Sequence, residues 1–327
     1  MNCVFVLGSG FSSDAGAPLT GTALGKIFHQ SRITRQLAEL KSYISDFLYQ
    51  GRSDWINASS LEEILSRLDI IRHYKPYPDV DYNEVIYYEE LLLKEFTTLL
   101  SPDKTNYLEE SYRIFSGILK AGDSIITFNY DLVIENLLSV YGNGFHYPDL
   151  STCKNSASSA GVFKLHGSIN MYYCPYCGQI YRFPESVTIH PLPGASAKTN
   201  DTSALLRCLN CSRPGKNIPL RHCIIAPTLF KSYSLPTLRS LWFSALKTLA
   251  DAGEIFFIGY SLPPADILSY QLFDFAARLS RLEQRVFLVN GGGKPAKRFK
   301  QLYGDSVCNT GMTFAEWTES KMNTSTY

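Results

Sequence analysis

Two Cys-x-x-C pairs give this chain of 327 residues its clearest chemical signal. The pairs are Cys174 with Cys177 and Cys208 with Cys211. Two thiolates three residues apart bind one side of a tetrahedral ion, and a second pair completes the coordination. The spacing therefore predicts a structural zinc site with four thiolate ligands, which leaves no open position for a substrate.

The cysteines also allow other interpretations. His222 or Cys223 could replace one thiolate, although both are better placed in the strand that follows. Disulfide bonds are the second alternative. Residues 1–7 have no basic region and run into glycines rather than a cleavage site, which disfavours a signal peptide and with it disulfides. We therefore expect a cytoplasmic protein.

A histidine at the end of an apolar run is the candidate base. His166 follows Val162–Leu165 and precedes Gly167. An isolated histidine is usually a packed or surface residue, but open α/β sheets bind ligands at the carboxyl ends of their strands. The position of His166 therefore favours a role in acid–base chemistry, because an imidazole can accept a proton near neutral pH.

Asn129 and Asp131 follow a second apolar run, at residues 124–128. Because this run is also expected to be a strand, we expect both side chains at the same crevice as His166. The alternative is that they only cap the following helix, and for Asp131 the two roles are compatible.

A turn with two glycines, Gly8-Ser9-Gly10, ends the first apolar run at residues 2–7. Backbone amides at a helix start bind phosphate, so the turn is a candidate nucleotide site. The third glycine of the dinucleotide-binding fingerprint is replaced by Ser13, and no acidic residue stands at 28–31, where the ribose-binding acid is expected. This argues against a dehydrogenase, and an ordinary tight turn is the alternative.

Two later strand ends complete the pattern. Gly259-Tyr260-Ser261 ends the run at 255–258, and Asn290 precedes three glycines. A glycine followed by a hydroxyl can admit and hydrogen-bond a ribose or a phosphate. Each position taken alone would be a turn, but five such positions at one sheet edge predict a nucleotide-binding crevice.

Strand and helix patterns alternate along the chain, which predicts an α/β fold with a Rossmann-like, doubly wound parallel sheet. Strands are expected at 162–165, 223–226, 254–260 and 285–290, and helices at 83–100, 105–120, 236–251 and 265–279. Ser60 and Glu63 form a capping box at another helix start. The residues Ser12-Ser13-Asp14 offer capping oxygens after the glycine turn.

One catalytic domain of residues 1–327, built from three parts, accounts for this pattern. The sheet and its helices comprise residues 1–29, 121–170 and 223–327, a helical subdomain is inserted at 30–120, and a small zinc-ribbon module occupies 171–222. Apolar residues at 45% and charged residues at 19% are ordinary for a soluble globular protein. The net charge of +1 gives no general attraction to nucleic acid, and no apolar stretch approaches the roughly 18 residues of a membrane span.

In this order the motifs resemble those of the sirtuin (silent information regulator) superfamily, in a divergent prokaryotic branch of the defence-associated NADase type. The stretch Gly8-Ser9-Gly10-Phe11-Ser12 is similar to the family's Gly-Ala-Gly-x-Ser turn, and Thr127–Asp131 is similar to Thr-Gln-Asn-Ile-Asp. His166-Gly167 resembles the catalytic His-Gly that precedes the zinc ribbon, and Gly259-Tyr260-Ser261-Leu262 resembles Gly-Thr-Ser-Leu. The resemblance spans nearly the whole chain.

The resemblance implies that NAD+ is the substrate and that zinc is structural. It implies that the dinucleotide is bound by Gly8, Ser9, Gly10, Phe11, Ser12, Gly259, Ser261 and Asn290. It also implies three catalytic residues: His166 as the base toward a ribose hydroxyl or a water, Asn129 to orient that water, and Asp131 to hold the carboxamide.

Departures from the family concern the peptide-binding side. Leu19-Thr20-Gly21 stands where deacylases have Asp-Phe-Arg, and Ile225–Phe230 stands where they have the stretch that pairs with an acyl-lysine peptide. Phe128 replaces the glutamine of Thr-Gln-Asn. The resemblance with these departures implies an NAD+ glycohydrolase that forms ADP-ribose and nicotinamide. The alternatives are an NAD-dependent deacylase or ADP-ribosyltransferase, and a non-catalytic module that senses NAD or ADP-ribose.

Branches with this divergence serve in antiphage defence by NAD+ depletion, commonly beside an ATPase or an Argonaute-like partner. The resemblance therefore implies a protein partner of that kind, a homo-oligomer, and no membrane or direct nucleic-acid binding. An unrestrained NADase is toxic, so we expect gating, with the helical block at 30–120 as its expected place.

Overall fold

The computed structural model describes residues 2–29, 33–52, 54–101, 106, 108–142, 144–148, 159–183, 207–212, 218, 220–225, 235–264, 266–292 and 296–324. The chain divides into two compact units. Unit 1 comprises Met1–Ala17, Pro102–Ser168 and Tyr233–Tyr327, and unit 2 comprises Pro18–Ser101 and Ile169–Ser232.

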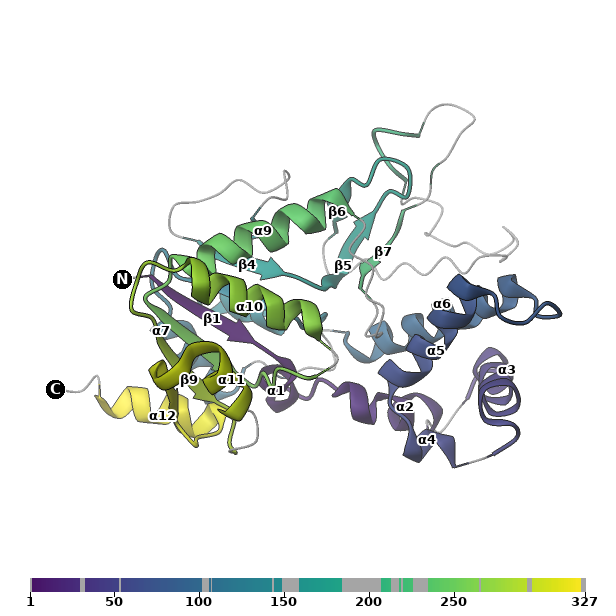
Figure 1. The fold of residues 1–327 in the computed structure, drawn as a ribbon, viewed down its shortest axis with the longest axis horizontal. Coiled ribbons are helices and arrows are strands. Elements are labelled where there is room, and N and C mark those ends of the chain that lie inside the picture. Colours follow the sequence, from purple (N-terminus) through teal and green to yellow (C-terminus); the bar gives the residue numbers. More distant parts are fainter. Residues whose placement is uncertain are drawn as a thin grey trace. The chain divides into compact units, whose positions relative to one another are not determined.

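Unit 1 is built on a seven-stranded sheet in the order β10-β9-β8-β1-β2-β4-β3, and all six strand pairs are parallel. The chain leaves the central strand β1 toward β2 and β4 on one side, and returns on the other side through β8, β9 and β10 (Figure 1). Such a reversal of strand order is where open α/β sheets bind ligands. The strands are β1 (Cys3–Leu7), β2 (Ser124–Thr127), β3 (Phe145–His146), β4 (Ala160–Lys164), β8 (Glu254–Ile258), β9 (Arg285–Val289) and β10 (Val307–Asn309).

Helices cover both faces of this sheet. Neighbouring side chains of a strand point to opposite faces, so a strand such as β8, with successive apolar residues, needs cover on both. On one face, Phe256 of β8 lies with its ring 5.7 Å from Trp317 of α12 (Phe314–Thr324). On the other face, the ring of Phe257 lies 5.0 Å from Phe273 of α10 (Ile267–Leu279) and 4.4 Å from Phe299 of α11 (Ala296–Tyr303). Helix α9 (Pro236–Ala250) packs beside α10, and α7 (Glu110–Ile118) packs beside α12 (Figure 1). The remaining helices of unit 1 are α1 (Ser9–Asp14), α8 (Val133–Val140) and the 3₁₀ turn Gly304–Ser306.

Unit 2 contains a helical part whose core is rich in aromatic side chains. Phe28 and Trp55 meet with ring centroids 5.4 Å apart, and the ring of Tyr49 stacks on Trp55. The predicted capping box is confirmed, because Ser60 Oγ accepts a hydrogen bond of 3.1 Å from the amide of Glu63. The helices are α2 (Thr20–Phe28), α3 (Arg35–Tyr43) with a π-helical turn at Ile44–Leu48, α4 (Trp55–Ala58), α5 (Leu61–Tyr74) and α6 (Tyr82–Leu99).

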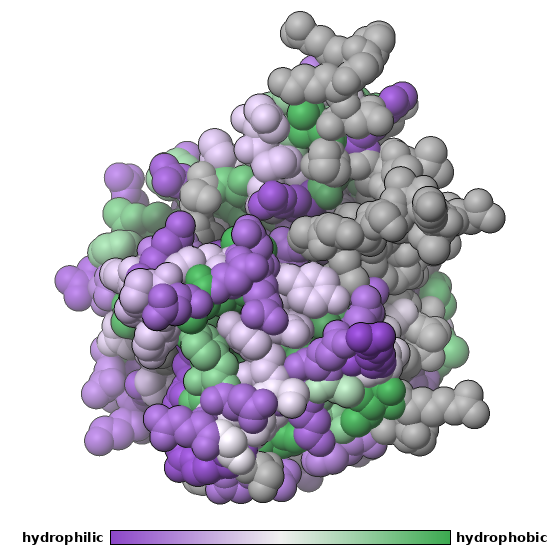
Figure 2. Space-filling model, turned by 90° about the vertical axis from the view of Figure 1, so that its right-hand side faces the viewer, coloured by the Kyte–Doolittle hydropathy of each residue, from purple (hydrophilic) through white to green (hydrophobic). Residues whose placement is uncertain are grey.

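Unit 2 also holds most of a small sheet in the order β6-β5-β7. Its strands are β5 (Gly167–Tyr173), β6 (Ile180–Arg182) and β7 (Arg221–Ile224), and β5 and β6 are antiparallel. On the face of the molecule in Figure 2, hydrophilic and hydrophobic residues are interspersed. No helix among the described residues combines the length and the apolar character needed to cross a bilayer.

The predicted α/β class and parallel sheet are confirmed, and so are the helices that became α6, α7, α9 and α10. Two expectations are wrong. The strand expected at 223–226 is β7, which pairs in the small sheet rather than in the parallel one. Ser12-Ser13-Asp14 do not cap a helix, because α1 already begins at Ser9 and ends at Asp14. The domain boundaries expected from the sequence stay a prediction.

Candidate functional site

The carboxyl ends of five parallel strands form the edge of the unit 1 sheet where the candidate site lies. Leu7 pairs in register with Thr127 of β2 and with Ile258 of β8, Thr127 pairs with Lys164 of β4, and Ile258 pairs with Val289 of β9. The residues that follow these partners therefore leave the sheet at one level. The predicted residues Gly8, Asn129, His166, Gly259 and Asn290 lie within two positions of these strand ends.

Close backbone packing explains the glycines of this edge. A Cβ atom on Gly8 would lie 2.5 Å from the carbonyl oxygen of Gly259, and one on Gly10 would lie 2.7 Å from Gly259 Cα. Gly259 has φ +61°, and a Cβ there would lie 2.2 Å from the amide nitrogen of Phe11. Any side chain at these positions would separate the β1–α1 turn from the end of β8. The glycines therefore bring two strand ends into contact.

The backbone amides of the turn already have partners inside the fold. Gly8 donates to the carbonyl of Ile258, Gly10 to that of Gly259, and Phe11 to that of Gly8, at 2.9–3.0 Å. The Phe11 side chain is buried and packs against Tyr112, Phe115 and Phe314, with ring centroids 5.0–5.5 Å apart. Within the turn from Gly8 to Ser12, Ser9 is the exposed residue.

Asn129 is fixed to the glycine turn by both hydrogen atoms of its side-chain amide. Its Nδ2 donates to the carbonyl of Gly8 at 2.8 Å and to Ser12 Oγ at 2.9 Å. Its backbone amide donates to Thr127 Oγ1 at 3.1 Å, and that hydroxyl donates to the carbonyl of Leu7. Ser12 is buried, and its hydroxyl fixes the orientation of the Asn129 side chain. The predicted residues Ser12 and Asn129 thus belong to one hydrogen-bond network.

His166 is 4% exposed and lies among aromatic rings. Its ring centroid is 5.1 Å from Phe128, 6.1 Å from Tyr130 and 6.3 Å from Trp242. Trp242 Nε1 donates to the carbonyl of Leu165 at 2.9 Å, which fixes the chain one residue before His166. Because Phe128 and Tyr130 flank Asn129 in sequence, the structure places Asn129 and His166, two of the three predicted catalytic residues, in one neighbourhood.

A carboxylate that sequence reasoning missed lies beside His166. Asp266 Oδ2 is 3.9 Å from His166 Nε2 and accepts a hydrogen bond of 3.2 Å from the hydroxyl of Tyr260. Both Asp266 and His166 are buried. In the sequence, Asp266 stands at the start of the helix predicted at 265–279, where an aspartate is usually interpreted as a cap.

Asp131 lies one residue before Leu132, the N-cap residue of α8, and binds the first amide of that helix. Its Oδ1 accepts a hydrogen bond of 3.1 Å from the amide of Val133, at the start of α8. Its carbonyl oxygen accepts from Lys164 Nζ. That ammonium is fully buried and pairs at 3.1 Å with Glu135, which also accepts a hydrogen bond of 2.9 Å from Tyr147. This buried network anchors the loop that carries Asn129.

Two remaining predicted residues follow β8 and β9. Asn290 Nδ2 donates to the carbonyl of Tyr260 at 3.0 Å, so its amide fixes the loop after β8. Ser261 is exposed in that loop.

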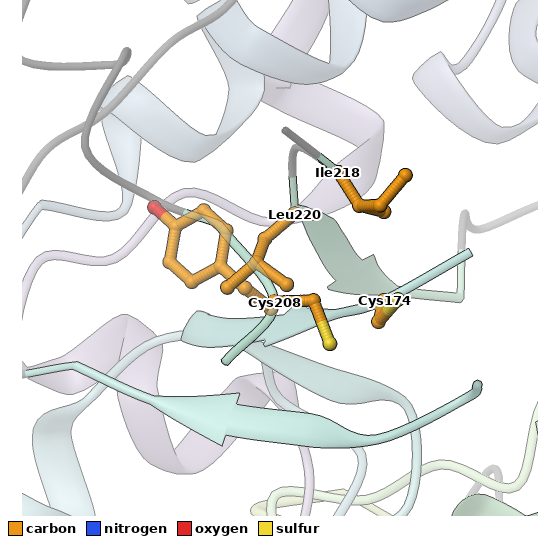
Figure 3. Close-up of a cluster of buried hydrophobic side chains, with 5 residues drawn as sticks. Cys174, Cys208, Ile218 and Leu220 are labelled. Carbon is orange, nitrogen blue, oxygen red and sulfur yellow. The ribbon is translucent and has the colours of Figure 1, made fainter. Parts of the chain in front are cut away.

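The predicted metal-binding cysteines lie together in unit 2. The sulfur atoms of Cys174, Cys177, Cys208 and Cys211 all lie within 4.8 Å of one another. Four thiolates around a tetrahedral zinc ion are separated by about 3.8 Å, given a Zn–S bond of about 2.3 Å. Cys177 Sγ and Cys208 Sγ are 3.6 Å apart, so the donor set fits zinc. Figure 3 shows Cys174 and Cys208 beside Ile218 and Leu220, which help to bury the cluster.

Hydrogen bonds favour the thiolate form of Cys208, whereas burial raises the pKa of Cys174 and the hydrogen bond with Cys177 raises that of Cys211. The amides of Tyr176 and Cys211 donate to Cys174 Sγ and Cys208 Sγ, at 3.4 and 3.3 Å. Burial by itself raises the pKa of Cys208, but hydrogen bonds led by the Tyr181 hydroxyl outweigh it and lower that pKa below its ordinary value. A thiolate is the form that binds a metal ion.

The alternative ligands lie outside this cluster. The cluster of possible metal ligands found among the described residues contains the four cysteines and neither His222 nor Cys223. Cys223 is buried in β7, where burial raises the pKa of its thiol to about 12. Each of the seven cysteines that the structure describes is a free thiol, so the disulfide alternative is not supported there.

Comparison with known proteins gives matches among solved structures. No protein-family model and no curated protein matches this sequence significantly. A mutant Sir2 homologue solved as an ADP-ribose complex is 16% identical with a TM-score of 0.51, over 100% of this chain and 94% of that one. A structure described as addressing the basis of sirtuin substrate affinity is 17% identical with a TM-score of 0.48, over 99% of this chain and 93% of that one.

The chain thus combines a doubly wound parallel sheet with a separate cluster of four cysteines. This chain has the sirtuin fold.

Proposed function

We propose that this protein is an NAD+ hydrolase that cleaves NAD+ to ADP-ribose and nicotinamide. One observation supports this proposal above the others: Asn129 is tied to the glycine turn while the residues on either side of it pack against His166. The glycine turn, expected to bind the dinucleotide, therefore lies close to Asn129 and His166, which are expected to act at its ribose. The mutant Sir2 homologue of the same fold was solved with ADP-ribose, which is one product of the proposed reaction.

The proposed reaction needs little acid catalysis. The nicotinamide of NAD+ is cationic, so the bond between its ring nitrogen and the ribose C1′ breaks with the electron pair going to nicotinamide, which leaves neutral. Water then forms the new C1′–O bond and gives up a proton. The site must stabilise a cation-like ribose and direct the water.

The residues divide these tasks. His166 accepts the proton from the water or from a ribose hydroxyl. Asn129 uses both amide hydrogens within the fold, so its Oδ1 is the atom that accepts a hydrogen bond from the attacking water. Asp131 has its Oδ1 bound to the amide of Val133, so in this proposal it acts mainly by fixing the loop.

Hydrolysis, rather than transfer to a peptide, is supported by the sequence departures. The family's acyl-lysine stretch is replaced at 225–230, of which only Ile225 is among the described residues. The glutamine of the family motif is replaced by Phe128, whose ring stacks on Tyr260 at 4.7 Å and packs beside His166. A site without a peptide clamp leaves water as the acceptor.

Incubation of the purified protein with NAD+ tests the proposal, with nicotinamide and ADP-ribose measured by chromatography. We expect nicotinamide release without any peptide, and loss of at least a hundredfold in His166→Ala and in Asn129→Ala. His146→Ala is the matched control, because His146 is another strand-end histidine of the same sheet and bonds Ser159 instead. Release that depends on an acetylated peptide would favour a deacylase. Bound NAD+ without release, in every oligomeric state and with every partner tried, would overturn the proposal.

We propose further that the activity serves antiphage defence by NAD+ depletion in the cytoplasm, gated by assembly with itself or by a partner such as an ATPase or an Argonaute-like protein. This role rests on the resemblance alone. It predicts that cellular NAD+ falls after infection in cells that express the wild-type protein and does not fall with His166→Ala. An unchanged NAD+ level in protected wild-type cells would refute it.

A further inference from the structure

The carboxylate of Asp266 has an unusual place for a residue at a helix start. Asp266 is the N-cap residue of α10, where an aspartate side chain normally accepts a hydrogen bond from the first helical amides. Its side chain makes no such capping bond. The carboxylate instead lies between the Tyr260 hydroxyl at 3.2 Å and His166 Nε2 at 3.9 Å. Helix capping therefore does not explain why the carboxylate points this way.

Burial makes this arrangement chemically significant. Asp266 is 3% exposed and His166 is 4% exposed, so water screens their interaction poorly. A buried carboxylate is costly unless it is paired or hydrogen-bonded. The Tyr260 hydroxyl satisfies part of this need, and the imidazole is the neighbouring group that can carry a positive charge.

The loop that carries Asp266 is fixed at several points. Asn290 donates to the carbonyl of Tyr260 at 3.0 Å, and Arg298 of α11 donates to the carbonyl of Leu262 at 2.7 Å. Leu262 has φ +51°, a left-handed conformation that costs a residue with a Cβ about 1 kcal/mol or more. These contacts hold the segment between β8 and α10 in a conformation that directs Asp266 toward His166.

We propose that Asp266 is the positioning residue of His166, and that it fixes the imidazole tautomer needed for the hydrolysis proposed above. Because a carboxylate only accepts hydrogen bonds and is negative, Asp266 favours the proton on the ring nitrogen that faces it, Nε2. The neutral ring therefore has its proton on Nε2, and Nδ1 is the nitrogen that accepts a proton from water or ribose. The 3.9 Å separation is an ion-pair contact, and catalytic hydrogen bonds that are long without ligand often shorten when substrate binds.

Asp266 also stabilises the imidazolium that forms when Nδ1 takes the proton. The other titratable side chains that the structure shows around the ring are Tyr130, which stacks on it, and Tyr260, which reaches it through Asp266. Phe128 and Trp242 add no charge. Lys164, two residues earlier, pairs with Glu135. Among these groups, Asp266 is the one that supplies negative charge directly at Nε2.

Nitrogen NMR of protein labelled with ¹⁵N-histidine tests the tautomer without any turnover of NAD+. His166→Gln identifies the His166 signals by their loss. We expect the neutral ring to carry its proton on Nε2 in the wild-type protein. We also expect the titration midpoint of the ring to move to lower pH by about one unit in Asp266→Asn, as for the loss of an adjacent opposite charge. A proton on Nδ1 in the wild-type protein would overturn the proposal, and this result does not require the variant to fold.

Kinetics supply the second readout. We expect Asp266→Asn to lower kcat for NAD+ hydrolysis at least tenfold with little change in KM, and Asp266→Glu to restore part of the loss. Asp274→Asn is the matched control, because Asp274 lies on the same helix and pairs with Arg278 at 2.8 Å. An Asp266→Asn variant with wild-type kcat and an unchanged titration midpoint would refute the role. A protein that shows the Nε2 tautomer and never releases nicotinamide would refute the proposed hydrolysis and leave the positioning contact intact.

Discussion

At the scale of single residues, the site is a set of side chains that hold one another. Asn129 binds Gly8 and Ser12, while Asp266 lies against His166 and accepts from Tyr260. The residue expected to orient water and the expected base thus each have a partner that is buried and polar. We propose that Asn129 and His166 are catalytic residues and that Ser12 and Asp266 position them.

Alanine substitutions at two adjacent serines, Ser12 and Ser13, distinguish a residue that positions Asn129 from one that only stabilises the fold. Ser12 Oγ accepts from Asn129 at 2.9 Å, whereas Ser13 Oγ donates to the carbonyl of Gly10 at 2.9 Å. Each substitution to alanine removes one hydrogen bond and lowers the free energy of unfolding by about 1 kcal/mol. We expect only Ser12→Ala to lower NAD+ turnover, by about tenfold or more, because Asn129 loses its orientation. Equal turnover in the two variants would contradict this role.

At the scale of elements, backbone contact between β1–α1 and the end of β8 shapes the edge. The sequence reveals glycines there, but not that they pack against each other. The expectation that their amides bind phosphate follows from a motif, whereas in the structure the amides of Gly8 and Gly10 donate to the carbonyls of Ile258, the last residue of β8, and of Gly259, which follows it. The acceptors of these amides lie at the end of β8, about 250 residues further along the chain. A local sequence pattern does not predict such a contact.

Gly10→Ala tests the close approach. Its Cβ would lie 2.7 Å from Gly259 Cα, so backbone must shift, and we expect the free energy of unfolding to fall by about 1–3 kcal/mol. Gly117→Ala is the matched control, because a Cβ on this glycine of α7 meets nothing within 4 Å. Alanine there should stabilise the protein by about 0.5–1 kcal/mol, as in other helix interiors. Denaturant unfolding measures both, and a neutral Gly10→Ala would argue against the packing.

Helices α5 and α6 bury a carboxyl group whose titration should be measurable. Burial raises the pKa of Glu89 from 4.5 to about 7, although Arg72, 3.1 Å away, opposes this, and Asp69 adds to the rise. Between these two values the unfolded chain loses the proton before the folded protein does. The contribution of Glu89 to stability is therefore greatest below pH 4.5 and falls as the pH rises to about 7.

Comparison of the wild-type protein with Glu89→Gln isolates this contribution. We expect the free energy of unfolding of the wild-type protein, relative to that of the variant, to decrease between pH 4.5 and pH 7. Denaturant titrations at several pH values provide the measurement. A difference that is constant or that increases with pH would show that the Glu89 pKa is not raised.

The small sheet and its four clustered cysteines form a second kind of element, whose sulfur atoms are arranged to fit a zinc ion. We expect one zinc per chain in the wild-type protein, in His166→Ala and in Cys223→Ser, and loss of zinc with a lower Tm in Cys208→Ser. Elemental analysis and thermal unfolding measure these properties. Zinc loss in Cys223→Ser together with retention in Cys208→Ser would assign the ligands differently.

At the scale of the whole molecule, the sequence predicts the parallel sheet and the edge at which the candidate residues gather. Parallel strands place their carboxyl ends together, so Gly8, Asn129, His166, Gly259 and Asn290 follow from strand position alone. Side-chain direction is harder to predict. Phe11 belongs to the expected binding motif, yet its ring lies in the core with α7 and α12, because packing across the sheet decides its orientation.

Asp266 shows the same limit. A proline-rich turn followed by an aspartate reads locally as a helix cap, and only the contact with a strand end 100 residues earlier changes that interpretation. The strand expected at 223–226 is wrongly placed in the parallel sheet for a related reason, since strand pairing is not a local property. Residues 184–206 of the expected zinc-binding module and 226–230 of the replaced peptide stretch lie outside the described residues.

The most direct test of the central claim is NAD+ turnover by the purified protein, measured with and without an acetylated lysine peptide. We expect nicotinamide and ADP-ribose in equal amounts without peptide, no stimulation by peptide, and release at least a hundredfold slower in His166→Ala, while His146→Ala behaves as the wild type. Nicotinamide release that requires the peptide, or equal release by the wild-type protein and His166→Ala, would contradict it.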